Sequence, residues 1–233
     1  MPVLASIALT PSAPVLVPEL AGAAAEVVPF RVAALAAAAE LPPRWIAIGT
    51  SPADPADAVF SCVRGSFAGY GVDVGVTLDP QAPPPVVAMP VCGLIAGWLR
   101  GQANPAGSVQ VRVYDAGLDA DAAMACGRTL RAVLDADEAP IGVLVVADGA
   151  STLSPSAPGG HRPEDEPVQA ALDDALAAGD VAALSHLPEA ILGRVAYQVL
   201  AGLAGAGPQA AREFVRGAPY GVGYFVGVWD FHP

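Results

Sequence analysis

The chain alternates short stretches of apolar residues with longer segments in which alanine and leucine recur among polar side chains. A short apolar run bounded by turn residues is typical of a strand that is covered on both faces of its sheet. The longer amphipathic segments have the length and composition of helices. The predicted strands cover residues 4–9, 45–49, 72–78, 109–114, 141–147, 213–216 and 222–229, and the predicted helices cover 18–40, 89–99, 119–134, 166–178 and 189–203.

This alternation predicts a single domain, residues 1–233, with an α/β/α sandwich fold and a mostly parallel or mixed central sheet. The last two strands flank a Gly-Ala-Pro-Tyr turn and are expected to form an antiparallel hairpin at the C-terminal edge. Pro29 is expected to kink the first helix. The segment 50–71 is expected to be a long loop, and the proline-rich segment 81–85 a stiff connector.

Hydrophobic residues make up 54% of the chain, but no uninterrupted apolar run reaches the roughly 18 residues that span a bilayer. Residues 1–5 lack the basic flank of a signal peptide, so a cytoplasmic protein is expected. A formal net charge of -12 opposes binding to nucleic acid and to anionic membranes. Every basic residue is arginine, which excludes Schiff-base chemistry by lysine and a phosphate-loop lysine.

The cysteines are Cys62, Cys92 and Cys126, which are odd in number and far apart. Neither a disulfide framework nor a structural zinc site is therefore expected. Cys92 and Cys126 lie in apolar, helical segments and are predicted to be buried thiols.

Small polar residues follow three of the predicted strands. Thr10-Pro11-Ser12-Ala13-Pro14 comes after the first strand, and Gly49-Thr50-Ser51-Pro52-Ala53 comes at the end of the second. Asp148-Gly149-Ala150-Ser151 follows the most apolar strand of the chain. Loops in these positions build the ligand sites of α/β sheets.

In order, spacing and position, these segments resemble the metal-site segments of the subunit-B-like class III extradiol dioxygenases and their Memo-type relatives. The resemblance spans nearly the whole chain and implies that the three loops converge on one cleft. The metal-site histidines of that superfamily correspond here to Ser12, Ala53 and Ser151. Since a non-haem Fe(II) site needs nitrogen and carboxylate donors, the resemblance implies a family scaffold that has lost its metal ligands.

The C-terminal segment 218–229, together with 64–67, 70–73 and 197–202, is similar to an actinobacterial branch of this superfamily. That branch often lacks the same histidines and has no established reaction. In metal-bearing relatives a glutamate tends to precede the C-terminal turn, where this chain has Arg216-Gly217. We therefore expect no metal ion and no cofactor, with Fe(II) only if the family activity is retained. The histidines that remain show no short metal-ligand spacing: they are His161, His186 and His232.

Five residues are candidates for the wall or rim of the cleft: Ser51, Arg64, Asp148, His161 and Tyr220. Asp148 would either bind a polar group of a ligand or hold its loop by accepting backbone N–H bonds. Arg64 would either grip a carboxylate or phosphate or form a structural salt bridge. Without three imidazoles the cleft is polar and roomy, so it is expected to hold water or a small ligand.

The leading hypothesis is a metal-free pseudoenzyme that binds a small molecule or a protein partner. The alternative is an active enzyme, either an extradiol dioxygenase with ferrous iron or a hydrolase that uses the inherited cleft. No Gly-x-Ser-x-Gly elbow surrounds Ser12, Ser51 or Ser151, which disfavours the hydrolase. A homodimer is a third hypothesis, and its contact would involve aromatic residues that otherwise pack in the core: Tyr220, Tyr224, Phe225 and Trp229.

Overall fold

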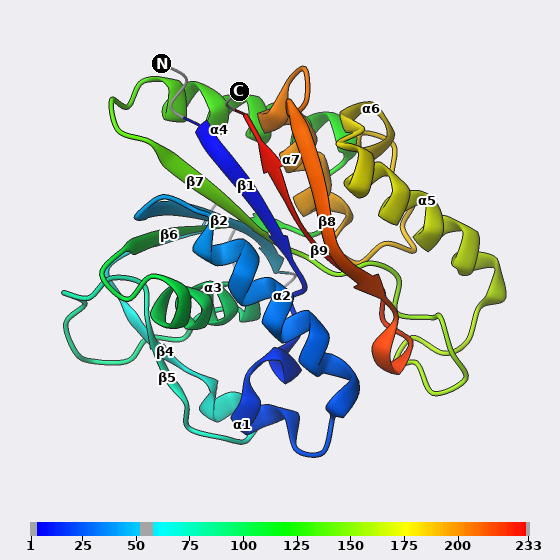
Figure 1. The fold of residues 1–233 in the computed structure, drawn as a ribbon, viewed down its shortest axis with the longest axis horizontal. Helices are drawn as coiled ribbons and strands as arrows, with labels where there is room; N and C mark the ends of the chain where they lie inside the picture. Colours follow the sequence, from blue (N-terminus) through cyan, green and yellow to red (C-terminus); the bar gives the residue numbers. More distant parts are fainter. Residues whose placement is uncertain (1–3, 52–57, 232–233) are drawn as a thin grey trace.

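A seven-stranded mixed sheet forms the centre of the computed structural model, which describes residues 4–51 and 58–231 (Figure 1). The strand order is β3-β6-β2-β7-β1-β9-β8, and β6, β2, β7 and β1 are parallel to one another. The edge strand β3 and the C-terminal strand β9 run antiparallel to their neighbours. The bounds are β1 Leu4–Thr10, β2 Arg44–Ser51, β3 Ala58–Phe60, β6 Ser108–Asp115, β7 Ile141–Val146, β8 Ala210–Gly217 and β9 Tyr224–Asp230.

Helices cover both faces of the sheet and enclose two apolar cores. One core contains the buried residues of α2 (Val28–Ala39) and α3 (Val91–Ala103). The other contains the buried residues of α4 (Ala120–Asp135), α5 (Glu166–Ala178) and α7 (Arg194–Ala204). The predicted α/β/α sandwich is thus confirmed. The short helices are α1 Pro18–Ala21, α6 Val181–Leu184, and the 3-10 turns Pro14–Leu16, Ala25–Val27, Phe67–Tyr70, Pro163–Asp165 and Pro219–Gly221.

The alternation of side chains explains why the parallel strands bury both faces. In β7 all six residues are buried, and they divide between the two cores by their parity along the strand. Val143 and Val145 contact the α4/α7 side, whereas Leu144 and Val146 contact the α2/α3 side. A strand covered on both faces needs an unbroken apolar run, which is the pattern that the sequence shows.

The C-terminal hairpin is confirmed, with β8 at the edge and β9 inside the sheet between β8 and β1. Three of its aromatic side chains belong to the core rather than to a surface. Tyr224, Phe225 and Trp229 are 5%, 3% and 0% exposed, and Tyr220 is 40% exposed. The Trp229 ring donates its N–H to the carbonyl oxygen of Leu176 at 2.8 Å. A dimer contact through all four aromatic residues is therefore not compatible with this packing.

Several predicted boundaries were wrong for local reasons. The first helix does not run continuously from residue 18 to residue 40, because Gly22 ends α1 with a positive φ of 52°. Pro29 does not kink a helix: it lies at the start of α2, where its missing N–H costs nothing. The last predicted helix begins at Arg194 rather than at residue 189, because Ile191 pairs with Ala150.

The segment 50–71 was also wrongly predicted to be a loop throughout. It contains β3 and the strand β4 (Arg64–Ser66), which pairs with β5 (Gly75–Thr77) in a separate two-stranded sheet. The predicted strand 72–78 is thus a short ribbon strand outside the central sheet. These strands are three residues long, too short for a clear pattern of alternation.

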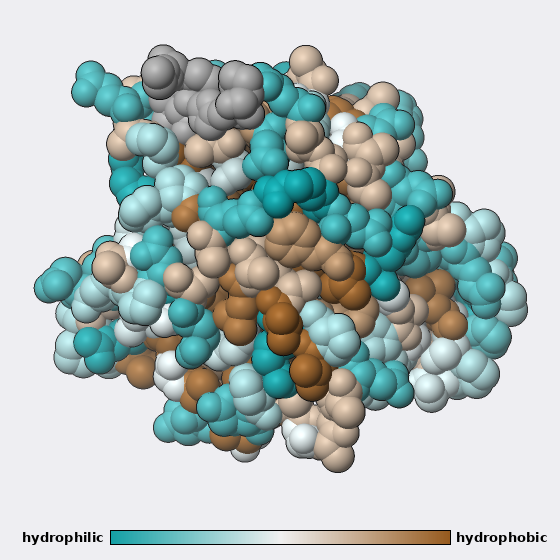
Figure 2. Space-filling view, in the orientation of Figure 1, coloured by the Kyte–Doolittle hydropathy of each residue, from teal (hydrophilic) through white to brown (hydrophobic). Residues whose placement is uncertain are grey.

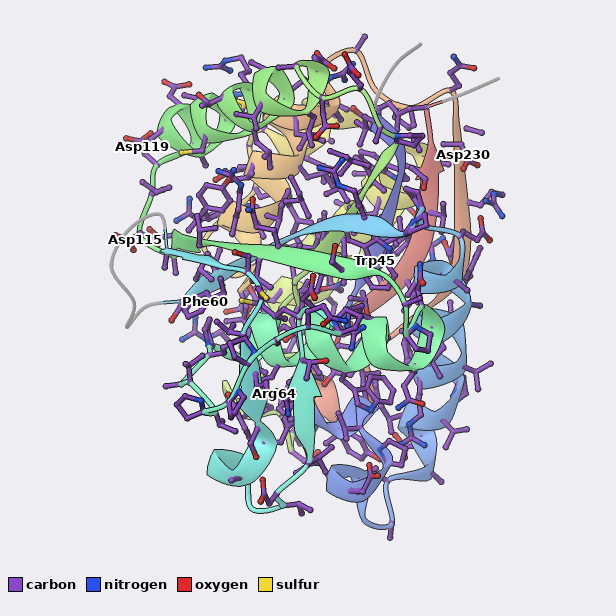
Figure 3. The ribbon with its side chains drawn as sticks, turned by 90° about the vertical axis from the view of Figure 1, so that its left-hand side faces the viewer. Trp45, Phe60, Arg64, Asp115, Asp119 and Asp230 are labelled. Carbon is purple, nitrogen blue, oxygen red and sulfur yellow. The ribbon has the colours of Figure 1, made fainter. Side chains whose placement is uncertain are left out.

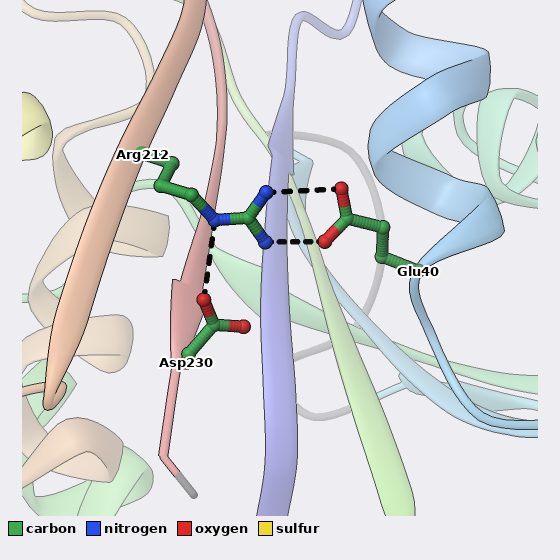
Figure 4. A network of polar contacts seen from close by, with 3 residues as sticks. All are labelled: Glu40, Arg212 and Asp230. Atoms are coloured by element: carbon green, nitrogen blue, oxygen red, sulfur yellow. Dashed lines mark hydrogen bonds and ion pairs between the residues drawn. The ribbon is translucent and has the colours of Figure 1, made fainter. Parts of the chain in front are cut away.

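An exposed ion-pair network fastens the C-terminal hairpin to the end of α2 (Figure 4). Arg212 on β8 donates to both carboxylate oxygens of Glu40 and, through Nε at 3.2 Å, to Asp230 on β9. These hydrogen bonds raise the pKa of the Arg212 guanidinium above its ordinary value, and those with Glu40 contribute most. Because the guanidinium is largely in solvent, the network contributes little beyond fixing where these elements meet.

The surface over α2 carries apolar side chains, which appear brown in Figure 2. The large exposed apolar residues of this helix are Val28 and Val32, at 43% and 61% exposure. Isolated apolar residues of this kind are common on protein surfaces. No helix in the described part of the chain is both long and apolar enough to cross a membrane.

Helices α4 and α7 meet backbone to backbone at two glycines. A Cβ atom on Gly127 would overlap the carbonyl oxygen of Val199, and one on Gly202 would overlap that of Met124. We expect Gly127→Ala to lower the free energy of unfolding by about 3 kcal/mol, because the helices must move apart. Gly101→Ala is the control: nothing lies within 4 Å of the added methyl, so a gain of about 0.5 kcal/mol is expected. Urea denaturation measures both, and equal stabilities would contradict this account of the contact.

Candidate functional site

The site lies where the carboxyl ends of β1, β2 and β7 come together. Parallel pairing aligns Thr10 with Val146, so the loops that follow these two strands leave the sheet side by side. A cavity of about 90 Å³ opens between them. Its lining residues come from all three strand ends, from the start of α3 and from the turn before α7: they are Ser12, Thr50, Cys92, Val146, Ala147, Asp148, Leu192 and Gly193.

Ser12 and Asp148 form a hydrogen-bonded pair in the wall of this cavity. The backbone N–H of Ser12 donates to Asp148 Oδ1 at 2.9 Å, and the Ser12 hydroxyl donates to Oδ2 at 2.5 Å. Burial raises the pKa of the Asp148 carboxyl, and the two bonds from Ser12 oppose that shift. Asp148 thus accepts a backbone N–H from a neighbouring loop, which is one of the two roles predicted for it.

The backbone on either side of Asp148 is held by groups from the start of α7. Gly193 donates its N–H to the carbonyl oxygen of Asp148 at 2.8 Å. The buried Tyr197 hydroxyl donates to the carbonyl oxygen of Ala147 at 3.0 Å. Burial, reinforced by the charge of Asp148, raises the pKa of Tyr197 well above its ordinary value, so it remains a neutral donor. Ser12, which follows β1, thus holds the carboxylate, and groups at the start of α7 hold the backbone around it.

Cys92 enters the cavity from the first turn of α3, where its side chain is buried against β2. Gly49 makes this approach possible, because a Cβ atom there would overlap both Cβ and Sγ of Cys92. The prediction that Cys92 is buried is confirmed, whereas Cys126 on α4 is only half-buried.

A buried glutamine connects this loop to the C-terminal hairpin. Gln169 on α5 accepts the N–H of Ala150 at 2.8 Å, and its amide donates to Asp173 Oδ1 at 2.8 Å. Its side chain passes between Gly149 and Gly223, at either of which a Cβ atom would overlap the amide. Gly149 also donates its N–H to the carbonyl oxygen of Gly223 at 2.8 Å.

Sequence reasoning missed this glutamine and its partner Asp173. Both lie four residues apart on the apolar face of α5, among residues such as Leu172 and Leu176 that pack in the core. Two polar residues at helical spacing on an apolar face are a signal of a buried hydrogen-bonded pair.

The structure brings only part of the predicted site together. Ser12 and Asp148 line the cavity, whereas the Ser151 hydroxyl lies against Gly159 in the neighbouring loop. Ser51 is 8% exposed and ends β2 beside Asp115. Ala53 lies outside the described residues.

The other three candidates do not line the cavity. Arg64 is exposed on β4, and its Nε donates to the carbonyl oxygen of Ala82 at 2.7 Å. Among the described residues it forms no salt bridge, which was one of its two predicted roles. His161 lies on the surface 3.9 Å from a Glu166 carboxylate oxygen. Tyr220 is exposed in the hairpin turn with a positive φ of 59°.

The residues present do not fit the ferrous iron that the family resemblance implies. The Ser12 hydroxyl donates its proton to Asp148. A neutral hydroxyl oxygen is also a weak ligand for ferrous iron. Among residues 4–51 and 58–231, no three His, Cys, Asp or Glu side chains are grouped closely enough to hold a metal ion. A single carboxylate beside a hydroxyl and a thiol lacks the imidazole nitrogens of such a centre.

Comparison with known proteins shows the fold and no more. No protein-family model matches the chain, and no curated protein matches its sequence. Among solved structures, the chain is similar to an uncharacterized protein, JW3007, from Escherichia coli K12. The two share 12% sequence identity at a TM-score of 0.57, over 96% of this chain and 98% of that one. This likeness extends over the whole α/β/α architecture.

Asp173 makes the stability of the protein depend on pH. Burial raises its pKa from 3.8 to about 6, although Gln169 and Arg216 favour the charged form. The folded state therefore holds this proton more tightly than the unfolded state, so the contribution of Asp173 to stability is complete below pH 4 and is lost as the pH rises through about 6. At 1.36 kcal/mol per pKa unit, the loss is about 3 kcal/mol. Between pH 4.5 and pH 7.5 about 2 kcal/mol of this loss takes place, and Asp173→Asn should remove it in urea denaturation at these two pH values. The control Asp174→Asn alters an exposed carboxylate and should keep the pH dependence.

A double-mutant cycle tests whether the Gln169 side chain requires glycine at position 223. Gly223→Ala should lower the free energy of unfolding by about 2 kcal/mol, because the new methyl displaces the buried amide. In a Gln169→Ala background the same substitution should cost clearly less, since the overlapping group is gone. Gly69→Ala, with nothing within 4 Å, serves as the control. Equal costs of Gly223→Ala in both backgrounds would mean that the glutamine is not the obstacle.

Proposed function

We propose that the chain is a metal-free binding protein built on a subunit-B-like extradiol dioxygenase scaffold. Its cleft takes a small molecule with hydrogen-bond donors in place of a metal ion. The observation that carries the proposal is the Ser12–Asp148 pair, which occupies the strand ends where the family resemblance puts a metal ligand. The protein belongs, on this proposal, to a branch that binds without ring cleavage.

The Asp148 carboxylate has acceptor capacity left for a ligand. A carboxylate offers about four lone-pair positions, and Ser12 uses two of them. Thr50 adds a hydroxyl to the same cavity. The volume of about 90 Å³ is several times the ~10–15 Å³ that one water needs. A hydroxyl or amino group of a ligand fits this space and satisfies the remaining acceptors.

The lining also provides an apolar contact beside the polar groups. Leu192 contributes to the cavity wall and is 55% exposed, so it lies at the opening to solvent. A molecule that carries adjacent hydroxyls on an apolar ring would place its donors near Asp148 and its ring against Leu192. Catechol has this shape and is therefore the probe of choice.

The proposal is tested first by metal content and turnover. Protein reconstituted anaerobically with Fe(II) and then desalted should retain far less than one iron per chain by mass spectrometry. Oxygen uptake with catechol should not exceed that of buffer containing the same free iron. Stoichiometric iron together with ring cleavage would overturn the proposal in favour of an active dioxygenase.

Catechol binding is the second test and is followed by calorimetry and by ligand-observed NMR. Asp148→Asn should weaken it by about tenfold, because a hydrogen bond to a charged acceptor is lost. Ser185→Ala alters a half-buried serine just after α6, outside the lining of the cavity, and should leave binding unchanged. Equal affinities of wild type and Asp148→Asn would show that catechol does not use this cleft.

A further inference from the structure

A groove larger than the Ser12–Asp148 cavity lies at the β3 edge of the sheet, the edge opposite to β8. It runs between α4 and the strands β3 and β6. Figure 3 faces this edge, with α4 above β6 and with Asp115 and Asp119 marking the connection between them. The groove has a volume of about 340 Å³, within the ~300–1,000 Å³ of ligand pockets. It is mostly apolar, and its lining residues are Ala58, Val59, Arg112, Val113, Tyr114, Ala125, Cys126, Thr129 and Leu130.

Arg112 is the charged residue of this lining. Val111 and Val113, its neighbours on β6, pack in the α2/α3 core, so Arg112 points to the opposite face, where α4 lies. Its side chain is half-buried, and its Nε atom is buried without a hydrogen-bond partner among the described residues. A buried donor without an acceptor is costly, which makes this guanidinium a strong site for an incoming oxygen.

Three of the described acidic residues on the neighbouring elements accept hydrogen bonds from other groups. Asp115 accepts the N–H of Gly117 at 2.8 Å, and Asp119 caps α4 through the N–H of Ala122 at 2.8 Å. Asp135, at the far end of α4, pairs with Arg131 at 2.8 Å. Within the part of the chain that the structure describes, no carboxylate forms an ion pair with Arg112.

The chemistry of the lining selects one class of ligand. A guanidinium presents parallel N–H donors that match the two oxygens of a carboxylate. One cation suits a monoanion better than a phosphate dianion, and the groove uses the middle of α4 rather than its N-terminus. The apolar remainder of the wall suits an aromatic or branched hydrocarbon body.

We propose that the groove between α4 and the β3–β6 edge binds a small apolar monocarboxylate, with its carboxylate on Arg112. The ligand body lies against Val59, Ala125 and Leu130. This site is separate from the Ser12–Asp148 cavity and shares no lining residue with it. It therefore stands or falls independently of the function proposed above.

The probe is 4-fluorobenzoate, whose binding is followed by calorimetry and by its fluorine NMR signal. Wild type should bind 4-fluorobenzoate at least tenfold more tightly than 4-fluorobenzyl alcohol, which lacks the charge. Arg112→Met keeps a long apolar side chain and should weaken binding by at least tenfold. Arg128→Met removes the same charge from an exposed position on α4 and should change affinity less than twofold.

A second variant tests whether 4-fluorobenzoate binds in the groove, and it leaves the charge of the protein unchanged. Ala125→Trp should fill the groove and abolish binding, whereas Val133→Trp, at an exposed position of the same helix, should not. Circular dichroism checks that each variant is folded. The proposal is overturned by absence of 4-fluorobenzoate binding at 10 mM, by equal affinity for acid and alcohol, or by equal affinity of wild type and Arg112→Met. Tighter binding of inorganic phosphate would likewise overturn it, because the site would then be one for oxyanions.

Discussion

The parallel pairing of β1 with β7 is the constraint on which the rest of the structure depends. Both strands are apolar and buried on both faces, so a slip of one residue would exchange the side chains that face the two cores. The pairing aligns Thr10 on β1 with Val146 on β7. Ser12 and Asp148 follow these residues by two positions and therefore lie close together. Their hydrogen bonds follow from that register, as does the cavity beside them. The strand β9 then pairs with the free side of β1 and brings the C-terminal hairpin to the same end of the sheet.

The polar groups at this end of the sheet mostly satisfy one another. Ser12 donates to Asp148, Tyr197 and Gly193 donate to the backbone around Asp148, and Gln169 accepts the N–H of Ala150. Groups that hydrogen-bond one another in this way form a rigid wall for a cavity and a poor set of metal ligands. The strand ends therefore form a cavity whose polar atoms favour hydrogen bonding over metal binding. The groove at Arg112 is different, because there a charged donor lacks a described partner inside an apolar wall.

Close backbone approaches hold these elements in place, and glycines permit them. Gly149 and Gly223 let Gln169 pass between two loops, Gly49 admits Cys92, and Gly127 and Gly202 allow α4 to touch α7. Each of these contacts joins segments that are distant in the sequence. Close packing of this kind leaves little freedom for the loop that carries Asp148, which contacts the end of β1, α5, α7 and the C-terminal hairpin.

The sequence by itself determined the fold class, the parallel core strands and the C-terminal hairpin, because a strand buried on both faces requires an apolar run that can be read directly. It also placed Ser12 and Asp148 at strand ends. Only the tertiary structure decided that these two residues pair and that Arg64, His161 and Tyr220 lie outside the cavity. Residues in loops have no periodic pattern from which the direction of their side chains can be predicted. It alone revealed the buried Gln169–Asp173 pair and the Arg112 groove. Such features arise where separate elements meet, and the residues of one element do not encode what the next element brings to them.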